Sequence, residues 1–182
     1  MLRARMGSRI PVSVLGATGV VGQRFVARLA RHPLFELSGL AASGRNAGRP
    51  YGEACAWRLA GEPHGGQGRR LLVEADPEVV RTPVVFSALD AGPARELEPA
   101  FARAGTLVFS NASAWRMEPD VPLLVPEVNP DHLRLIEVQR QRRGWSGGIL
   151  CNPNCTTTVL AMVLGPLHQA FGVEAVVMTS LQ

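Results

Sequence analysis

The residue with the clearest capacity for chemistry is Cys155, in the run Asn-Pro-Asn-Cys-Thr-Thr-Thr at 152–158. Apolar residues at 148–151 predict a strand before it, and the apolar residues after it recur at helical spacing. These are Val159, Met162, Val163, Leu167 and Phe171. Cys155 is therefore expected at or near the first turn of a helix, where free backbone N–H groups and the helix dipole stabilise a thiolate. The position predicts a nucleophilic cysteine.

A lone cysteine is more often a small buried hydrophobe, and on position alone this alternative stays open. The neighbouring residues favour chemistry. Asn152 and Asn154 flank the thiol with short amides suited to positioning an acyl oxygen, and three threonines at 156–158 keep the turn polar. Because a buried cysteine would prefer aliphatic neighbours, we predict that Cys155 is catalytic.

A glycine-rich turn at 16–22, Gly-Ala-Thr-Gly-Val-Val-Gly, follows an apolar strand predicted over 9–15. The helix after it should end at His32-Pro33. Its inner face is expected to hold Val21, Phe25, Val26 and Leu29. Such a turn lets the backbone approach a pyrophosphate, and the helix N-terminus supplies N–H groups. We predict dinucleotide binding, with a purely structural turn as the alternative; the residues expected to hold the cofactor are Gly16, Thr18, Gly19, Val20, Val21 and Gly22.

The end of the second predicted strand, 35–42, indicates which dinucleotide. Enzymes that select NAD place an acidic residue about 20 positions beyond the glycines. Residues 41–46 contain no carboxylate, whereas Ser43 and Arg45 supply a hydroxyl and a guanidinium suited to a 2′-phosphate. NADP is therefore predicted, and the alternative for Arg45 is a solvated loop residue.

The remaining elements predict an α/β fold with a mostly parallel sheet. A regular pattern resumes at 71–74, and further strands are expected at 83–89, 106–110, 123–126 and within 173–182. Further helices are expected at 93–104 and from the cap Asn129 to near Gly144. Pro99 should disturb the first of these helices. Arg116 follows the 106–110 strand, where open sheets hold ligands, and is assigned to an anionic substrate, with a plain surface arginine as the alternative. The Gly- and Pro-rich segment 48–68 receives no chemistry, and His64 is expected to be a loop histidine.

Composition narrows the class of protein. The chain has 182 residues, 46% of them hydrophobic and 19% charged, with a net charge of +4. It lacks an apolar run of membrane-spanning length, a secretory signal and a basic stripe with aromatic residues, so neither membrane nor nucleic acid is an expected partner. Three cysteines without metal-ligand spacing predict free thiols in a reducing, cytoplasmic compartment and no metal site.

Several of these blocks together resemble aspartate-semialdehyde dehydrogenase, in the branch shared by archaea, fungi and some bacteria. They are 16–25, 40–45, 87–89, 111–117, 121–133 and 152–157. The resemblance runs from about Val12 to Gln182 and covers nearly the whole chain.

The resemblance implies a Rossmann-type NADP-binding domain at 1–151, followed at 152–182 by the start of a glyceraldehyde-3-phosphate-dehydrogenase-like α+β catalytic domain. It implies NADPH-dependent reductive dephosphorylation of L-4-aspartyl phosphate to aspartate semialdehyde, toward lysine, threonine and methionine. Cys155 would attack the acyl phosphate and form a thioester, Arg116 would bind phosphate or carboxylate, and Asn154 would orient the acyl group. Ser87 and Ala88 would lie along the cofactor, and Gln182 would line the active site.

Chains of that family are about twice as long, and their acid–base histidine lies in the second half. His168 matches no family motif. We therefore predict an N-terminal fragment that lacks turnover alone, with an unpaired and aggregation-prone last strand, and a homo-oligomeric full-length protein.

Other functions stay open. N-acetyl-γ-glutamyl-phosphate reductase shares the fold, but its motif has glycine before the thiol and Tyr-Pro after it, where this chain has Asn154 and Thr156-Thr157. Malonyl-CoA reductase resembles the same branch. A non-catalytic NADP-binding module is the third alternative.

Overall fold

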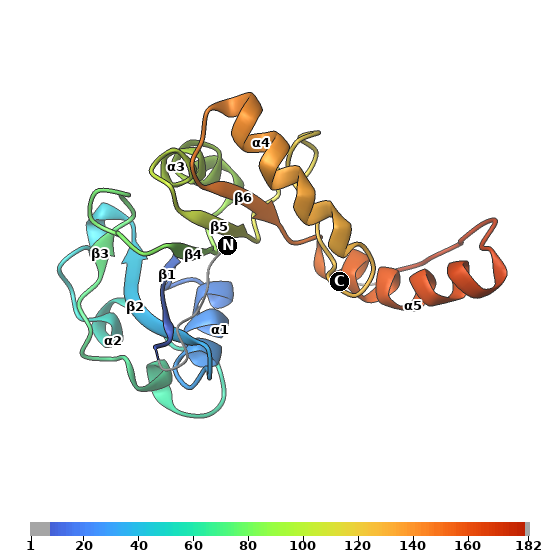
Figure 1. Cartoon of the computed structure of the whole chain (residues 1–182). Coiled ribbons are helices and arrows are strands. Elements are labelled where there is room, and N and C mark those ends of the chain that lie inside the picture. The colour runs from blue at the N-terminus through green and yellow to red at the C-terminus, as the bar shows by residue number, and fades with distance from the viewer. Residues whose placement is uncertain (1–7, 181–182) are drawn as a thin grey trace.

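A six-stranded parallel sheet organises the computed structural model, which describes residues 8–180 (Figure 1). The strands are β1 (Ile10–Leu15), β2 (Phe35–Ala42), β3 (Val73–Glu74), β4 (Val84–Ser87), β5 (Leu107–Ser110) and β6 (Gly148–Cys151). Their order is β3-β2-β1-β4-β5-β6, and every pairing is parallel. The chain direction across the sheet reverses between β1 and β4, and ligands of such sheets bind beyond the strand ends at this switch point.

Within residues 8–180, five α-helices and three short 3₁₀ turns lie between the strands or after the last of them. The helices are α1 (Val20–Leu29), α2 (Tyr51–Ala54), α3 (Ala91–Arg103), α4 (Leu135–Arg143) and α5 (Cys155–Phe171). The 3₁₀ turns are η1 (Gly44–Asn46), η2 (Pro63–Gly66) and η3 (Pro130–Arg134). The predicted Rossmann-type architecture is confirmed.

Two hydrophobic cores cover the two faces of the sheet, because successive strand residues point to opposite sides. The core against α3 includes Leu15, Val85, Phe101, Val108 and Ile149. The core against α1 and α2 includes Val12, Val14, Val26, Leu40 and Tyr51. A parallel sheet buried on both faces is the reason that its strands read as continuous apolar runs.

The glycine, proline and asparagine residues used to predict the helices act as expected with two exceptions. Gly144 ends α4 in the left-handed conformation, with φ of 64°. Pro99 was expected to disturb α3, but the helix runs unbroken through it. Asn129 is the N-cap residue of η3, as predicted, but its side chain makes no capping bond. It accepts from the Val125 N–H at 2.8 Å and donates to the Leu123 carbonyl at 2.9 Å.

Two predicted strands are wrong. Residues 123–126 form only one isolated bridge, between Leu123 and Cys151. Residues 173–180 adopt neither helix nor strand, so no final strand exists in the described part of that run. β-branched residues favour a strand only where a neighbouring strand offers hydrogen-bond partners. In the described structure, no strand pairs with residues 173–180.

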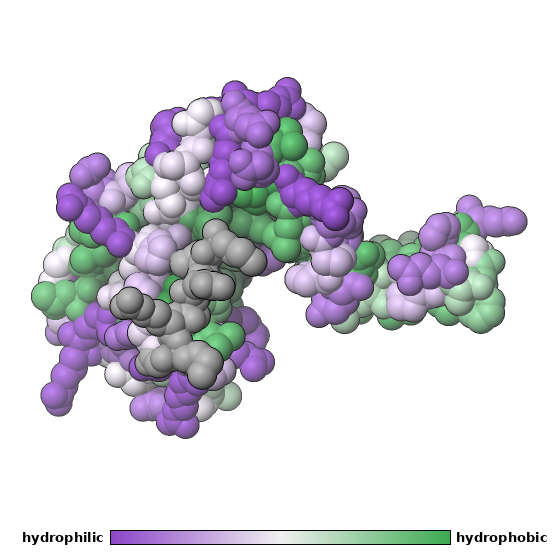
Figure 2. Space-filling view, in the orientation of Figure 1, coloured by the Kyte–Doolittle hydropathy of each residue, from purple (hydrophilic) through white to green (hydrophobic). Residues whose placement is uncertain are grey.

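The helix after Cys155 is separated from the two cores. α5 extends away from the sheet in Figure 1, and it has no buried residue among those described. Its apolar positions are exposed, including Val159 at 69% and Phe171 at 83%, and Figure 2 shows hydrophobic surface along this arm. Within residues 8–180, no helix is both long enough and apolar enough to cross a membrane.

Candidate functional site

One pocket of about 620 Å³ lies at the carboxyl ends of β5 and β6 and the start of α5. Its lining residues are Val21, Asn111, Arg116, Leu124, Val125, Pro126, Glu127, Asn152, Pro153, Asn154, Cys155, Thr158 and Val159. Cys155, Asn154 and Arg116, which the sequence singled out separately, are thus brought together. Val21 comes from the first turn of α1, so the pocket also borders the helix that follows the glycine turn.

Cys155 is the first residue of α5, as predicted from the sequence. Asn154 is the N-cap, and its side-chain oxygen accepts from the Thr157 N–H at 2.7 Å. The Thr158 hydroxyl donates to the Asn154 carbonyl at 3.1 Å and closes the same turn. One function of Asn154 is therefore to start the helix that presents the thiol; its contact with an acyl group stays a prediction.

Exposure separates Cys155 from the other two cysteines. Cys155 is exposed, whereas Cys55 and Cys151 are buried. Burial, reinforced by the nearby Glu98 carboxylate, raises the pKa of Cys151 to about 12, and burial also raises the pKa of Cys55. A thiol reacts as its thiolate, so the two buried cysteines are poor nucleophiles. The alternative of a buried structural cysteine does not hold for Cys155.

Arg116 is half-buried at the wall of the pocket. Its Nη2 donates to the carbonyl of Asn111 at 2.7 Å, and its buried Nε has no hydrogen-bond partner in the described structure. The Asn152 amide donates to Asn111 Oδ1 at 2.6 Å and joins the two flanking segments. A buried donor without a partner is costly, so an anion beside this guanidinium would satisfy it.

The glycine turn fits a dinucleotide pyrophosphate. Gly16 has φ of +72°, and a Cβ there would lie 2.6 Å from the Ala88 carbonyl oxygen. A Cβ on Gly22 would lie 2.2 Å from the Gly16 carbonyl oxygen. Gly19 caps α1 without a side chain, which leaves the first-turn N–H groups uncovered. Val21 is 46% exposed, so its predicted place on the inner face of the helix is wrong, and buried Gln23 occupies that face.

The segment 48–68, for which no chemistry was predicted, braces this turn. The fully buried Tyr51 donates its hydroxyl to the Ala17 carbonyl at 2.9 Å. Gln23 donates to the carbonyls of Thr18 at 3.0 Å and Ala56 at 3.1 Å, and it accepts from the Arg58 N–H. A glutamine on an otherwise apolar helix face was the sequence signal for this contact.

His64 is packed rather than free in its loop. Its Nε2 lies 3.1 Å from the Cys55 carbonyl oxygen, and its ring contacts those of Tyr51 and Trp57. Within residues 8–180, the His, Cys, Asp and Glu side chains form no group of three or more able to hold a metal ion.

The remaining predicted site residues differ in how exposed they are. Ser43 and Arg45 are exposed at the end of β2, and Ala88 contacts the glycine turn through its backbone. Ser87 is fully buried; its hydroxyl faces Glu98, although it makes no hydrogen bond of ordinary geometry. Any contact of Ser87 with a cofactor would fall to its backbone. Gln182 lies outside the described residues.

Comparison with known proteins agrees with this geometry. Residues 11–136 match the family described as semialdehyde dehydrogenase, NAD binding domain. The chain is 52% identical over 174 residues to an aspartate-semialdehyde dehydrogenase of Methanothermobacter thermautotrophicus, covering 95% of this chain and 50% of the relative. It is 37% identical to a malonyl CoA reductase (NADP) of Metallosphaera sedula, covering 97% of this chain and 50% of that relative.

A solved structure shares the fold. The aspartate semialdehyde dehydrogenase of Candida albicans, crystallised with NADP, superimposes with a TM-score of 0.82 at 42% identity, covering 91% of this chain and 48% of that one. The chain thus spans about half the length of the relatives it matches. With its glycine turn and its exposed Cys155, it belongs to the semialdehyde dehydrogenase family and corresponds to the N-terminal half of aspartate-semialdehyde dehydrogenases from archaea and fungi.

Proposed function

We propose that this chain is the cofactor-binding and nucleophile-bearing half of an NADPH-dependent aspartate-semialdehyde dehydrogenase. The observation that carries the proposal is the single pocket that joins Cys155, Arg116 and the first turn of α1. A nucleophile, an anion-binding guanidinium and a dinucleotide-binding helix are three of the groups that reduction of an acyl phosphate requires.

In the proposed reaction, the Cys155 thiolate attacks the acyl carbon of L-4-aspartyl phosphate. A carbon–sulfur bond forms, the carbon–oxygen bond to phosphate breaks, and inorganic phosphate leaves. Arg116 would hold the phosphate by charge-assisted hydrogen bonds from its guanidinium, whose Nε the protein leaves unpaired. Asn154 fixes the thiol at the start of α5, where the helix dipole favours negative charge.

Bound NADPH would supply the hydride that reduces the thioester to the aldehyde. Gly16, Gly19 and Gly22 keep the turn free of side chains, and Tyr51 and Gln23 hold its carbonyl groups in place. The exposed residues Ser43 and Arg45, which directly follow β2, would donate hydrogen bonds to the 2′-phosphate. This supports NADPH over NADH.

Residues 1–151 would form the cofactor domain and residues 152–182 the beginning of the catalytic domain. Two observations support this division. The family match ends at residue 136, and α5 is exposed along its length. Further chain, corresponding to the second half of the relatives, would cover α5, supply an acid–base group and complete the active site. The isolated chain would then lack turnover, and the whole protein would act as a homo-oligomer in the cytoplasm.

Malonyl-CoA reduction is the second candidate, favoured by the 37% identical relative from Metallosphaera sedula. It uses the same covalent logic, with coenzyme A thiol in place of phosphate as the leaving group. The two functions differ in which leaving group the pocket must accept.

The test uses the chain extended through its natural downstream reading frame. Phosphate-dependent reduction of NADP by aspartate semialdehyde should be observed, and malonyl-CoA-dependent oxidation of NADPH should not. The reverse pattern would replace the first function by the second. If neither reaction occurs while NADPH still binds, the chain belongs to a binding module instead.

A further inference from the structure

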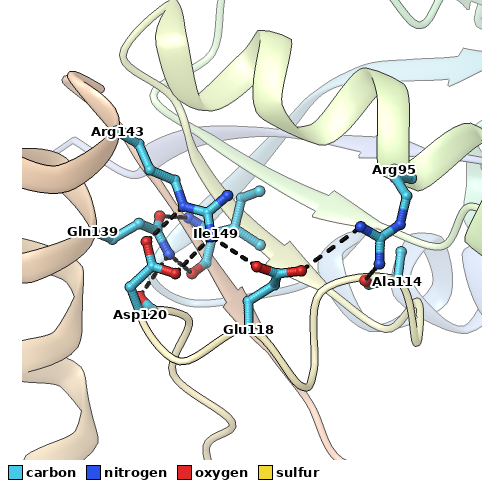
Figure 3. A network of polar contacts seen from close by, with 7 residues as sticks. All are labelled: Arg95, Ala114, Glu118, Asp120, Gln139, Arg143 and Ile149. Atoms are coloured by element: carbon cyan, nitrogen blue, oxygen red, sulfur yellow. Dashed lines mark hydrogen bonds and ion pairs between the residues drawn. The ribbon is translucent and has the colours of Figure 1, made fainter.

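The segment 111–121, which follows β5 and carries Arg116, contains neither helix nor strand. The Arg116 side chain donates one hydrogen bond, to the carbonyl of Asn111 in this same segment. Its position therefore depends on what holds the segment. Several of those contacts belong to a network around Arg143, the last residue of α4 (Figure 3).

Arg143 binds the segment through a fork of hydrogen bonds. Its Nε donates to Asp120 Oδ2 and its Nη2 to Asp120 Oδ1, both at 2.6 Å. Nη2 also donates to Glu118 Oε2 at 3.1 Å. The Asp120 side chain is 3% exposed, so this ion pair is shielded from water. Hydrogen bonding to Arg143 holds the pKa of Asp120 below its usual value.

Arg143 also packs against two indole rings. Its guanidinium carbon lies 5.2 Å from the ring centre of Trp115 and 5.2 Å from that of Trp145, and the two rings meet edge to face. Trp115 directly precedes Arg116. Arg95 of α3 contacts the same segment. Its guanidinium carbon lies 5.1 Å from the centre of the Trp115 ring, and its Nη1 lies 3.7 Å from Glu118 Oε1.

The backbone of the segment is tied to the sheet as well. Gln139 is fully buried and donates to the carbonyls of Asp120 at 3.1 Å and Ile149 at 3.2 Å. It accepts from the Ile149 N–H at 2.7 Å. Residues on both sides of Arg116 are thus fixed to α3, α4 and β6, whereas Arg116 itself extends to the pocket wall.

We propose that Arg143 is a positioning residue for the anion site: by fixing Trp115, Glu118 and Asp120, it aims Arg116 into the pocket that contains Cys155. The inference rests on the proposed function only for the identity of the anion, phosphate. Lysine cannot replace Arg143, because it lacks both the two-pronged fork and the flat face that stacks on indole rings.

The test measures how well inorganic phosphate protects Cys155 from iodoacetamide in the extended chain, since Cys155 and Arg116 line one pocket. In Arg143→Lys, the phosphate concentration that gives half protection should rise about tenfold, as expected for one displaced charge-assisted contact. The KM for phosphate should rise in parallel, and the KM for NADP should not change.

Two controls separate positioning from stability. Arg81→Lys alters an exposed ion pair with Glu78 and should leave phosphate protection unchanged. Val12→Ala weakens the core on the opposite face of the sheet and should lower the melting temperature without altering phosphate protection. If Arg143→Lys fails to fold, Asp120→Asn, which keeps the shape of the carboxylate, should show the same rise.

A double mutant gives the deciding result. If Arg143 acts through Arg116, adding Arg143→Lys to Arg116→Ala should weaken phosphate protection no further. Multiplying effects would overturn the inference, as would unchanged protection in Arg143→Lys or a wild-type Cys155 that phosphate does not protect. If phosphate protects Cys155 but the extended chain has no turnover with aspartate semialdehyde, the proposed function fails and the positioning inference stands.

Discussion

At the scale of single residues, environment rather than residue type determines the chemistry. The three cysteines have the same side chain, yet only Cys155 is exposed. It lies at the start of α5, in one pocket with Arg116, whose Nε has no hydrogen-bond partner in the described structure. The glycines of the turn are likewise defined by what surrounds them, because the Ala88 and Gly16 carbonyl oxygens leave no room for a Cβ.

Alkylation tests the difference among the cysteines. At neutral pH, iodoacetamide should modify Cys155 at least about tenfold faster than Cys55 or Cys151, because the latter two are buried and their thiol pKa values are raised. Peptide mass spectrometry gives the three rates, and the unfolded chain, in which all three should react alike, is the control. Equal rates in the folded chain would remove Cys155 from its proposed role.

The glycine turn is tested by Gly22→Ala. A Cβ 2.2 Å from the Gly16 carbonyl oxygen forces the turn away from α1, so unfolding free energy should fall by about 1–3 kcal/mol or more and NADPH affinity should fall with it. The matched control is Gly92→Ala in α3, where a Cβ meets nothing within 4 Å. Urea unfolding and NADPH fluorescence titration measure both effects, and equal behaviour of the two variants would contradict the assignment.

Cofactor choice is tested at Arg45. Arg45→Ala should weaken NADPH binding about tenfold and leave NADH binding unchanged, because only the 2′-phosphate loses a charged partner. Arg28→Ala, an exposed arginine in the last turn of α1, is the control and should alter neither. A loss of affinity shared by both cofactors would mean that Arg45 does not read the phosphate.

At the scale of elements, α3 contributes a buried carboxyl group beneath the site. Glu98 is fully buried, and its Oε1 accepts from the Ser110 hydroxyl at 2.7 Å. The Ser110 oxygen in turn accepts from the Ala112 N–H at 3.1 Å, at the start of the segment that carries Arg116. Burial raises the pKa of Glu98 against the opposing effect of the Ser87 and Ser110 hydroxyls.

A raised carboxyl pKa has a defined effect on stability. Because the folded state favours the neutral form, the contribution of Glu98 to stability falls as pH rises from its unfolded pKa of about 4.3 to its folded pKa, and is constant above it. Glu98→Gln removes this dependence. Its unfolding free energy relative to the wild type should therefore increase in urea melts as the pH rises above the unfolded pKa of about 4.3. A constant difference would show that Glu98 ionises as readily as an exposed carboxyl.

At the scale of the whole molecule, local pattern predicted the elements well and their long-range contacts poorly. Five strands, the glycine turn and the helix at Cys155 follow from short-range periodicity and punctuation. The strands predicted at 123–126 and within 173–182 were wrong, because a strand needs a neighbouring strand to pair with, and composition alone does not supply one.

The contacts that hold the site join residues far apart in the chain. The bond from Tyr51 to Ala17 and that from Arg143 to Asp120 depend on how the elements pack, and neither has a signature in spacing. Residue types at the pocket, Cys155, Asn154 and Arg116, were accessible from the sequence because helix starts and strand ends place them at one edge of the sheet. The network of Arg143 that holds the segment carrying Arg116 was not accessible in this way.

The exposed helix α5 offers a test at this scale. If further chain covers α5 in the whole protein, the 182-residue chain should bind the dye ANS more strongly than the extended chain does. Val163→Lys on α5, at a position that is 58% exposed, should reduce the excess in the short chain. Equal dye binding by both lengths would show that α5 stays uncovered.

The most direct measurement of the central claim traps the covalent intermediate on Cys155. The extended chain is mixed with aspartate semialdehyde and NADP in the absence of phosphate, and NADPH formation is followed rapidly. We predict a burst of about one NADPH per site, an aspartyl adduct on the Cys155 peptide, and release of that adduct on adding phosphate. Cys155→Ser should show neither burst nor adduct. A burst that survives in Cys155→Ser, or turnover of the wild type without any adduct on Cys155, would exclude Cys155 as the nucleophile.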